Sequence, residues 1–191
     1  MALEEKIKNI IEEKIYNRIK RKVAKNEILF DNGYILGQSE DLVLTRGVSD
    51  FKFVGFSIFP KREIQKIRNN KFDNYYDKIM ISEGEKEKLE NKTEVDLSSW
   101  ESVFQTFQKN ETTVIVECEN PKISSFTIGP VKKVTSKKVF IQYFDAEGYF
   151  DKKPTKIKFK HISKVQFGDP YSSVFSKYTR ERALVDEKVK S

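Results

Sequence analysis

The residues best suited to binding another molecule are lysines in the second half of the sequence. Residues 126 to 178 contain eleven lysines and four acidic residues, an excess of seven positive charges that equals the +7 net charge of the whole chain. Lys132, Lys133, Lys137 and Lys138 cluster at one expected turn, Lys156, Lys158 and Lys160 alternate along one expected strand, and Tyr143 and Tyr149 lie near them in the sequence. Lysines attract phosphates and aromatic rings stack on bases, so these nine residues are the candidate site for RNA or DNA.

A structural role for the same lysines is the competing interpretation. Lysines also coat exposed sheet faces and edges, where they prevent strand-to-strand aggregation. Every member of the two clusters is lysine, whereas bidentate recognition of phosphate favours arginine. Nucleic-acid binding is therefore the alternative hypothesis, and binding of a protein partner is the leading one.

Residue types that support catalysis are scarce. His161 is the only histidine and Cys118 the only cysteine, which is too few for a metal site of the usual His/Cys kind. The neighbours of His161 form no catalytic motif, and neither a phosphate-binding loop nor a dinucleotide-binding glycine motif is present. We expect no enzymatic activity and no cofactor.

Bulk composition predicts a folded, cytoplasmic protein. Hydrophobic residues make up 38% of the 191 residues and aromatic residues 13%, enough to build a core. A single cysteine suits a reducing compartment. The N-terminal residues lack the features of a secretory signal, and no stretch approaches the roughly 18 consecutive apolar residues that a membrane span needs.

The first half of the sequence predicts one helix followed by short strands. Apolar residues recur every four positions from Leu3 to Val23, which predicts a helix over residues 3–24. Asp31-Asn32-Gly33 predicts a hairpin turn between two strands, because Asn and Gly tolerate the positive φ of tight turns. Further strands are expected at 42–45, 51–59 and 63–68.

The second half predicts the same order of elements. Ser98 and Glu101 have the spacing of a capping box and predict a helix with an apolar face. Strands are expected at 112–119, 125–135, 138–145, 155–160 and 164–167, and a last short helix at 179–190. The acidic stretch before Ser98 predicts a linker.

Two sequence features suggest that one module occurs twice. Gly37 and Gly129 each follow an aromatic-x-aliphatic triplet. Ile64 and Ile67 match the spacing of Ile162 and Val165. We therefore expect an α+β protein with two repeats, each an N-terminal helix followed by a small, bent, five-stranded barrel. The expected domains are 1–80, an acidic linker 81–96, and 97–191 including a C-terminal tail.

A helix followed by five short strands, with a tight step between the last two, resembles the Sm-like small β-barrel, and SH3-like barrels share most of this arrangement. The resemblance covers residues 3–68 and 98–167. The stretch from Phe144 to Tyr171 also resembles an uncharacterised family of bacterial proteins with such barrels. Sm proteins bind RNA in rings, so the resemblance implies a role with RNA or in protein interaction. The Asp-x-x-Asn-type signature of RNA-binding members is absent after the third and fourth strands, and Arg46-Gly47 comes one strand too early for their Arg-Gly signature.

We therefore expect a non-enzymatic interaction module whose partner is another protein or a second copy of the chain, with RNA or DNA binding by the second barrel as the alternative. Partners would add to exposed strand edges or pack between the barrels. Rising salt should weaken phosphate binding steeply and an apolar protein interface much less.

Overall fold

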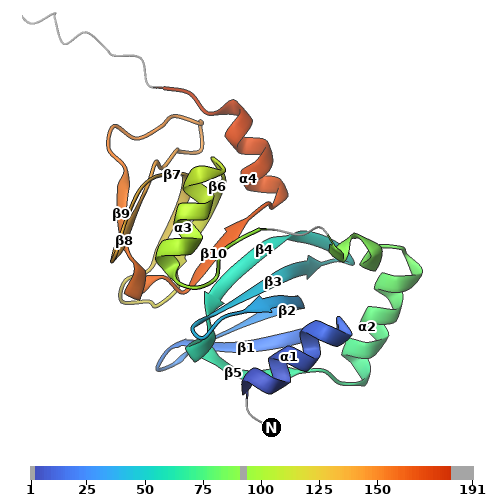
Figure 1. Cartoon of the computed structure of the whole chain (residues 1–191). Coiled ribbons are helices and arrows are strands. Elements are labelled where there is room, and N and C mark those ends of the chain that lie inside the picture. The colour runs from blue at the N-terminus through green and yellow to red at the C-terminus, as the bar shows by residue number, and fades with distance from the viewer. Residues whose placement is uncertain (1–2, 91–93, 182–191) are drawn as a thin grey trace, which may run out of the picture.

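The computed structural model describes residues 3–90 and 94–181 and shows an α+β fold. Ten antiparallel strands form one open sheet in the order β5-β1-β2-β3-β4-β10-β6-β7-β8-β9 (Figure 1). The strands are β1 (Tyr16–Ala24), β2 (Glu27–Gln38), β3 (Leu42–Ser49), β4 (Lys52–Pro60), β5 (Ile64–Arg68), β6 (Thr113–Cys118), β7 (Ser125–Thr135), β8 (Lys138–Ile141), β9 (Thr155–Lys158) and β10 (Lys164–Phe167). The α-helices are α1 (Leu3–Glu13), α2 (Lys71–Ser82), α3 (Trp100–Lys109) and α4 (Pro170–Phe175).

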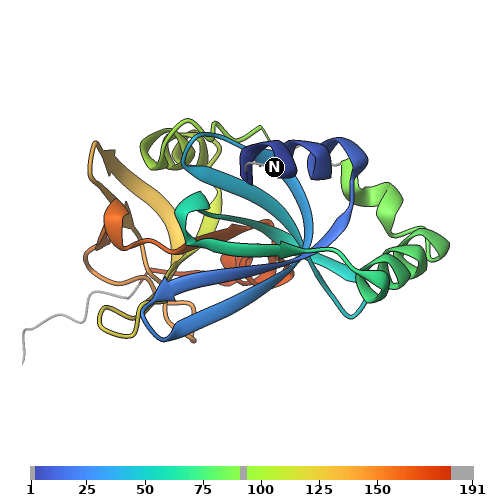
Figure 2. The same cartoon turned by 90° about the horizontal axis from the view of Figure 1, so that it is seen from below.

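The two halves of the sheet have the same internal order. We call α1 with β1–β5 the N-terminal half, and α3 with β6–β10 the C-terminal half. In each half the last strand pairs with the first, and the others follow in chain order. A short 3-10 turn precedes each last strand: η1 (Lys61–Glu63) precedes β5 and η3 (Phe159–His161) precedes β10. Helices α1 and α3 lie on the same side of the sheet (Figures 1 and 2).

The predicted helix over residues 3–24 is wrong in its second part. Helix α1 ends at Glu13, Lys14 has a left-handed φ of 50°, and the amide of Ile15 donates to the carbonyl of Ile10. Strand β1 then runs from Tyr16 to Ala24. Within it Asn17, Ile19 and Arg21 are buried, which is the two-residue period of a strand. The four-residue spacing of apolar residues agrees with a period of two as well as with a helix, and this ambiguity caused the error.

The hairpin predicted at Asp31-Asn32-Gly33 is also wrong. These residues lie inside β2, and the turn between β1 and β2 falls at Lys25 and Asn26. Gly33 has a φ of 148°, and a Cβ built there would lie 2.0 Å from the carbonyl oxygen of Arg46. The positive φ therefore serves a close approach of β2 to β3 within the sheet.

The C-terminal half agrees closely with the prediction. The second predicted strand has the observed bounds of β7, and the last has those of β10. Helix α3 begins one residue later than predicted, because Ser99 is the residue that caps it, accepting from the amide of Ser102. Val103, Phe104 and Phe107 are buried in the largest hydrophobic cluster, and Trp100 packs against this cluster. The strands predicted at 138–145 and 155–160 end early, at Ile141 and Lys158.

Strands β4 and β10 join the two halves. Phe56 pairs with Phe167 in register, and their rings stack with centroids 5.2 Å apart. The largest hydrophobic cluster contains Leu42, Leu44 and Ile58 from the N-terminal half together with side chains of α3 and β6–β10. This cluster therefore spans both halves, whereas α1 packs on a separate cluster within the N-terminal half.

A buried ionic cluster also crosses the boundary. Arg21 of β1 has a side chain that is 0% exposed and contacts three carboxylates, Asp31 at 2.6 Å, Glu63 at 2.9 Å and Glu119 at 2.9 Å. The same guanidinium donates to the carbonyl of Ser163 at 3.1 Å. Glu119 and Ser163 belong to the C-terminal half, so Arg21 ties the halves together through polar contacts.

Further helical elements lie outside the two halves, and of these α2 and α4 were not predicted. Helix α2 begins at a capping box formed by Asn70 and Asp73. The segment η2 (Lys86–Glu90) lies within the predicted acidic linker. Helix α4 is capped by Asp169, whereas most of the helix predicted at 179–190 lies outside the described residues.

No helix in residues 3–90 and 94–181 is long and apolar enough to cross a membrane.

Candidate nucleic-acid interface

Four of the predicted lysines project from one face of the sheet formed by β7, β8 and β9. Lys133 of β7 and Lys156 of β9 both pair in register with Phe140 of β8. Two residues along, Lys138 of β8 pairs with Lys158 of β9. Side chains two residues apart on a strand share a face, so the four lysines surround Phe140. We call this set the lysine face: Lys133, Lys138, Phe140, Lys156 and Lys158.

The opposite face of the same strands fills the core. Val139 and Ile141 of β8 are fully buried, and Ile157 of β9 is nearly so. This alternation of apolar and basic residues fixes the direction of the lysines, because turning them inward would place charge in the core. The lysine face is thus held by a rigid sheet rather than by a loop.

The lysine face carries positive charge without acidic partners. Lys138 and Lys158 lie directly opposite each other on neighbouring strands, and like charges in such a pair are destabilising. Among the described residues, none of the four lysines forms an ion pair with a carboxylate. The amine of Lys133 lies over the ring of Phe140, 5.9 Å from its centroid. An anion bound on this face would relieve the repulsion.

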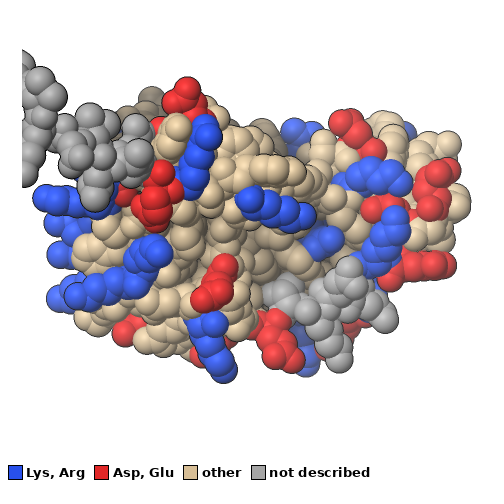
Figure 3. Space-filling model, turned by 90° about the horizontal axis from the view of Figure 1, so that it is seen from above, with Lys and Arg blue, Asp and Glu red and all other residues tan. Residues whose placement is uncertain are grey.

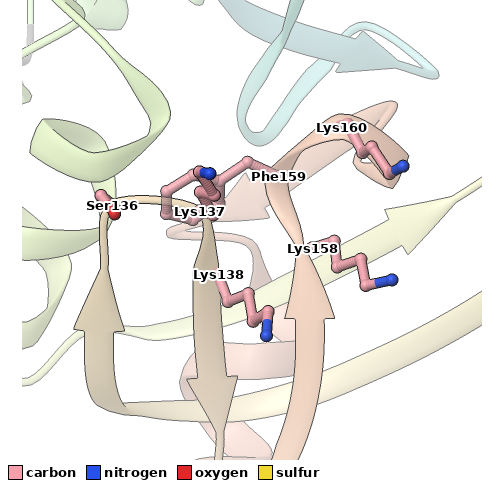
Figure 4. Close-up of a pocket in the computed structure, with 6 residues that line it drawn as sticks. All are labelled: Ser136, Lys137, Lys138, Lys158, Phe159 and Lys160. Atoms are coloured by element: carbon pink, nitrogen blue, oxygen red, sulfur yellow. The ribbon is translucent and has the colours of Figure 1, made fainter.

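A hollow adjoins the lysine face at the end of β8 and β9. Its volume is about 480 Å³, and its lining consists of Ser136, Lys137, Lys138, Lys158, Phe159 and Lys160. Lys138 and Lys158 extend from adjacent strands toward the same side, and Lys160 lies on the following turn (Figure 4). We call this space the basic hollow. It brings together four of the seven predicted lysines.

The remaining predicted residues lie elsewhere. Lys132 is exposed at a β-bulge, and its carbonyl accepts from Gln108. Tyr143 and Tyr149 belong to the loop after β8, at the end of the strand away from the basic hollow. Strand β8 ends at Ile141, the amide of Tyr143 donates to the carbonyl of Ile141 in a tight turn, and Tyr143 packs against a separate hydrophobic cluster. The ring of Tyr149 is covered by Arg180, whose guanidinium carbon lies 4.2 Å from the ring centroid. The two tyrosines are therefore not brought together with the lysines.

Phe140 is the aromatic residue that the sequence analysis missed. It lies between Lys133 and Lys156 in the sheet. The signal was present in the sequence as the alternation of Lys138, Val139, Phe140 and Ile141, which places Phe140 on the face of Lys138. Proximity in sequence had favoured the tyrosines instead.

Positive charge gathers at one end of the molecule. Lys and Arg side chains crowd the left end in Figure 3, the side on which Figure 1 places β8 and β9. Three of the four acidic residues between 126 and 178, Asp145, Glu147 and Asp151, lie in the loop after β8, away from the basic hollow. The fourth, Asp169, is buried and caps α4.

His161 lies near a carboxylate and a hydroxyl. It lines a small hollow together with Glu63 and Ser163. Glu63 binds Arg21, and the Ser163 hydroxyl donates to the carbonyl of Glu117 and accepts from the amide of Glu119. No hydrogen bond joins His161 to either side chain in the described part of the chain. In residues 3–90 and 94–181 no group of three or more His, Cys, Asp or Glu side chains could hold a metal ion.

Comparison of the chain with protein-family models, with curated proteins and with solved structures finds no match.

Proposed function

We propose that this chain is a binding protein made of two small five-stranded barrels of the Sm-like or SH3-like kind, and that its C-terminal half binds single-stranded RNA or DNA. The binding surface is the lysine face with the basic hollow beside it. The chain acts by holding its partner and not by catalysis.

Parallel details in the two halves support the duplicated barrel. Each half has a helix, a first strand, and a 3-10 turn before the last strand. Lys14 and Glu111 follow the two helices with φ values of 50° and 51°. Gly33 and Gly129, with φ values of 148° and 153°, occupy the second strand of each half. Tightly bent strands of this kind are a feature of small barrels.

The observation that carries the nucleic-acid proposal is the row of unpaired lysines around Phe140. An array of lysines on a rigid face attracts a phosphate backbone, and an aromatic ring between them offers a surface for a base. A single strand can bring both backbone and base to such a surface, whereas a duplex hides its bases.

Salt-dependent binding tests this proposal. Fluorescence polarisation with labelled twelve-nucleotide oligo(U) and oligo(dT) should show binding that weakens roughly 50-fold between 50 and 200 mM salt. This estimate assumes four neutralised phosphates, each of which adds about 0.7 to the slope of log affinity against log salt. In the variant Lys138→Gln/Lys158→Gln we expect about tenfold weaker binding at low salt and a slope reduced by about 1.4.

The matched control is Lys71→Gln/Lys78→Gln, which removes two exposed lysines from α2 at the far end of the sheet (Figure 1). Both variants change the net charge equally. Equal losses in the two variants, or no binding of wild type at 50 mM salt, would refute the nucleic-acid proposal.

Strand addition by a protein partner is the second candidate. Within the chain, strand β4 of the N-terminal half pairs with β10 of the C-terminal half along its edge. The amide of Phe159 donates to the carbonyl of Lys137, which precedes β8. Because backbone groups point to alternate sides along a strand, those of Lys156 and Lys158 then face the open edge of β9. An extended acidic segment suits this edge. Absence of nucleic-acid binding at low salt would favour this candidate.

A further inference from the structure

A second hollow lies at the boundary between the two halves. Its volume is about 250 Å³. The N-terminal half contributes Lys22, Val23, Arg62 and Glu63, and the C-terminal half contributes Asn120, Ile123, Lys160, His161, Ile162 and Ser163. We call this space the junction hollow. Its walls exist only because the two halves are held side by side.

The junction hollow is dominated by cationic and donor groups. Lys22, Arg62 and Lys160 are exposed, and among the described residues none of the three forms an ion pair. The one carboxylate in the lining, Glu63, faces Arg21, whose Nη1 lies 2.9 Å from its Oε2. Asn120 accepts the amide of Lys122 through its Oδ1 and keeps its NH₂ group as a donor. These groups suit a phosphate, which accepts hydrogen bonds through several oxygens.

The junction hollow adjoins the basic hollow. Lys160 lines both spaces. In Figure 4 it lies on the turn after β9, beyond Lys158. Cationic residues thus continue from Lys138 and Lys158, through Lys160, to Arg62 of the other half. A volume of about 250 Å³ is below the roughly 300–1,000 Å³ of ordinary ligand pockets, so it fits a segment of backbone better than a whole ligand.

We propose that a nucleic-acid strand bound on the lysine face continues across the boundary between the halves and places a backbone phosphate in the junction hollow, held by Lys22, Arg62 and Asn120. This inference rests on the proposed nucleic-acid function. It assigns a second subsite in which both halves of the chain contact the same strand. Only a ligand several nucleotides long reaches from one subsite to the other.

Ligand length and a neutral double variant test the inference. In Lys22→Gln/Arg62→Gln we expect about tenfold weaker binding of twelve-nucleotide oligo(dT), and binding of a four-nucleotide oligo(dT) within twofold of wild type. The control is again Lys71→Gln/Lys78→Gln, which should change neither ligand by more than twofold. Equal weakening of both lengths, or no weakening of the longer one, overturns the second subsite while the lysine face stands.

The ring of His161 gives a readout that does not depend on affinity. His161 is the only histidine, so its imidazole proton signals are unique in an NMR spectrum. Saturating twelve-nucleotide oligo(dT) should shift them, and four-nucleotide oligo(dT) should shift them much less. Unmoved signals with the longer ligand bound overturn the inference. Failure of the wild type to bind either ligand is a distinct result, because it removes the proposed function itself.

Discussion

At the scale of single residues, Arg21 sets the electrostatics of the boundary. Burial alone would lower the pKa of this guanidinium, but Asp31 and Glu119 outweigh burial and hold its pKa above the ordinary value. Burial raises the pKa of the Asp31 carboxyl, but the charges of Lys164 and Arg21 outweigh burial, so its pKa is lowered overall. Three carboxylates share one guanidinium, so one of them gains too little charge compensation. Glu63 is that group, since burial raises its pKa to about 7.

Glu63 predicts a specific pH dependence of stability. Its folded pKa of about 7 exceeds the ordinary 4.5, so the folded state holds this proton more tightly than the unfolded chain does. The resulting stabilisation is complete below about pH 4.5 and is lost as pH rises through 7. We expect Glu63→Gln, which cannot ionise, to lose less stability than wild type between pH 5 and pH 8, by roughly 1–3 kcal/mol.

Urea denaturation of wild type and Glu63→Gln at pH 5, 6.5 and 8 measures this difference. The comparison between the two proteins cancels the titration of other groups that the substitution leaves alone. Parallel pH profiles would show that Glu63 ionises normally in the folded protein.

At the scale of elements, the strands of the C-terminal half were predictable and the end of the first helix was not. The bounds of β7 and β10 were predicted correctly. The N-terminal error came from residues 16–24, whose apolar residues continue the four-residue spacing of the helix before them although they form β1. The glycine match was also misplaced, because Gly33 and not Gly37 shares the positive φ of Gly129. Backbone φ depends on contacts across the sheet, which no local pattern records.

The same limit applies to the candidate site. Lysine composition located the basic region, and strand alternation was enough to place Lys156 and Lys158 on one face. Pairing in register, which brings Lys138 opposite Lys158, depends on how β8 meets β9. The junction hollow needs β1 beside η3, a contact between residues about 140 positions apart, as for Arg21 and Ser163 at a separation of 142. Such contacts follow from the whole sheet and could not be predicted from the sequence.

The end of α3 gives a prediction at the element scale. Glu111 has a left-handed φ of 51°, and the amide of Thr112 donates to the carbonyl of Phe107, which is a Schellman-type ending. Glycine adopts this φ without the steric cost of a side chain. We expect Glu111→Gly to raise the free energy of unfolding by about 1 kcal/mol.

Glu111→Ala is the matched control, because it removes the same charge and keeps the steric cost. Urea denaturation should place the alanine variant below the glycine variant. Equal stability of the two variants would show that φ at this position carries no strain.

At the scale of the whole molecule, the hydrophobic cluster that spans both halves and the Arg21 cluster predict one cooperative unfolding transition. Trp100 is the only tryptophan, and its fluorescence reports on the C-terminal half. Hydrogen exchange of β1–β3 amides reports on the N-terminal half. The two probes should give the same free energy of unfolding in wild type, as expected for a single two-state unit.

Arg21→Met tests the contribution of the cluster to this unit. The substitution leaves three carboxylates facing one another without their shared cation, and breaking a buried ionic contact in this way costs about 3–5 kcal/mol. We expect both probes to report this loss of unfolding free energy together. Loss in one half alone would show that the halves unfold independently.

The order of strands in the sheet has a consequence for synthesis of the chain. Strand β10 lies in the middle of the sheet but is the last strand in the sequence. Its neighbour β4 is complete at Pro60, roughly a hundred residues earlier, and contributes Phe56, Ile58 and Phe59 to buried positions. At about 5–20 residues per second a ribosome needs on the order of 5–20 s to supply β10 after β4. During that interval the nascent N-terminal half presents an apolar strand edge without its partner, and this is the stage at which a chaperone would protect the protein most.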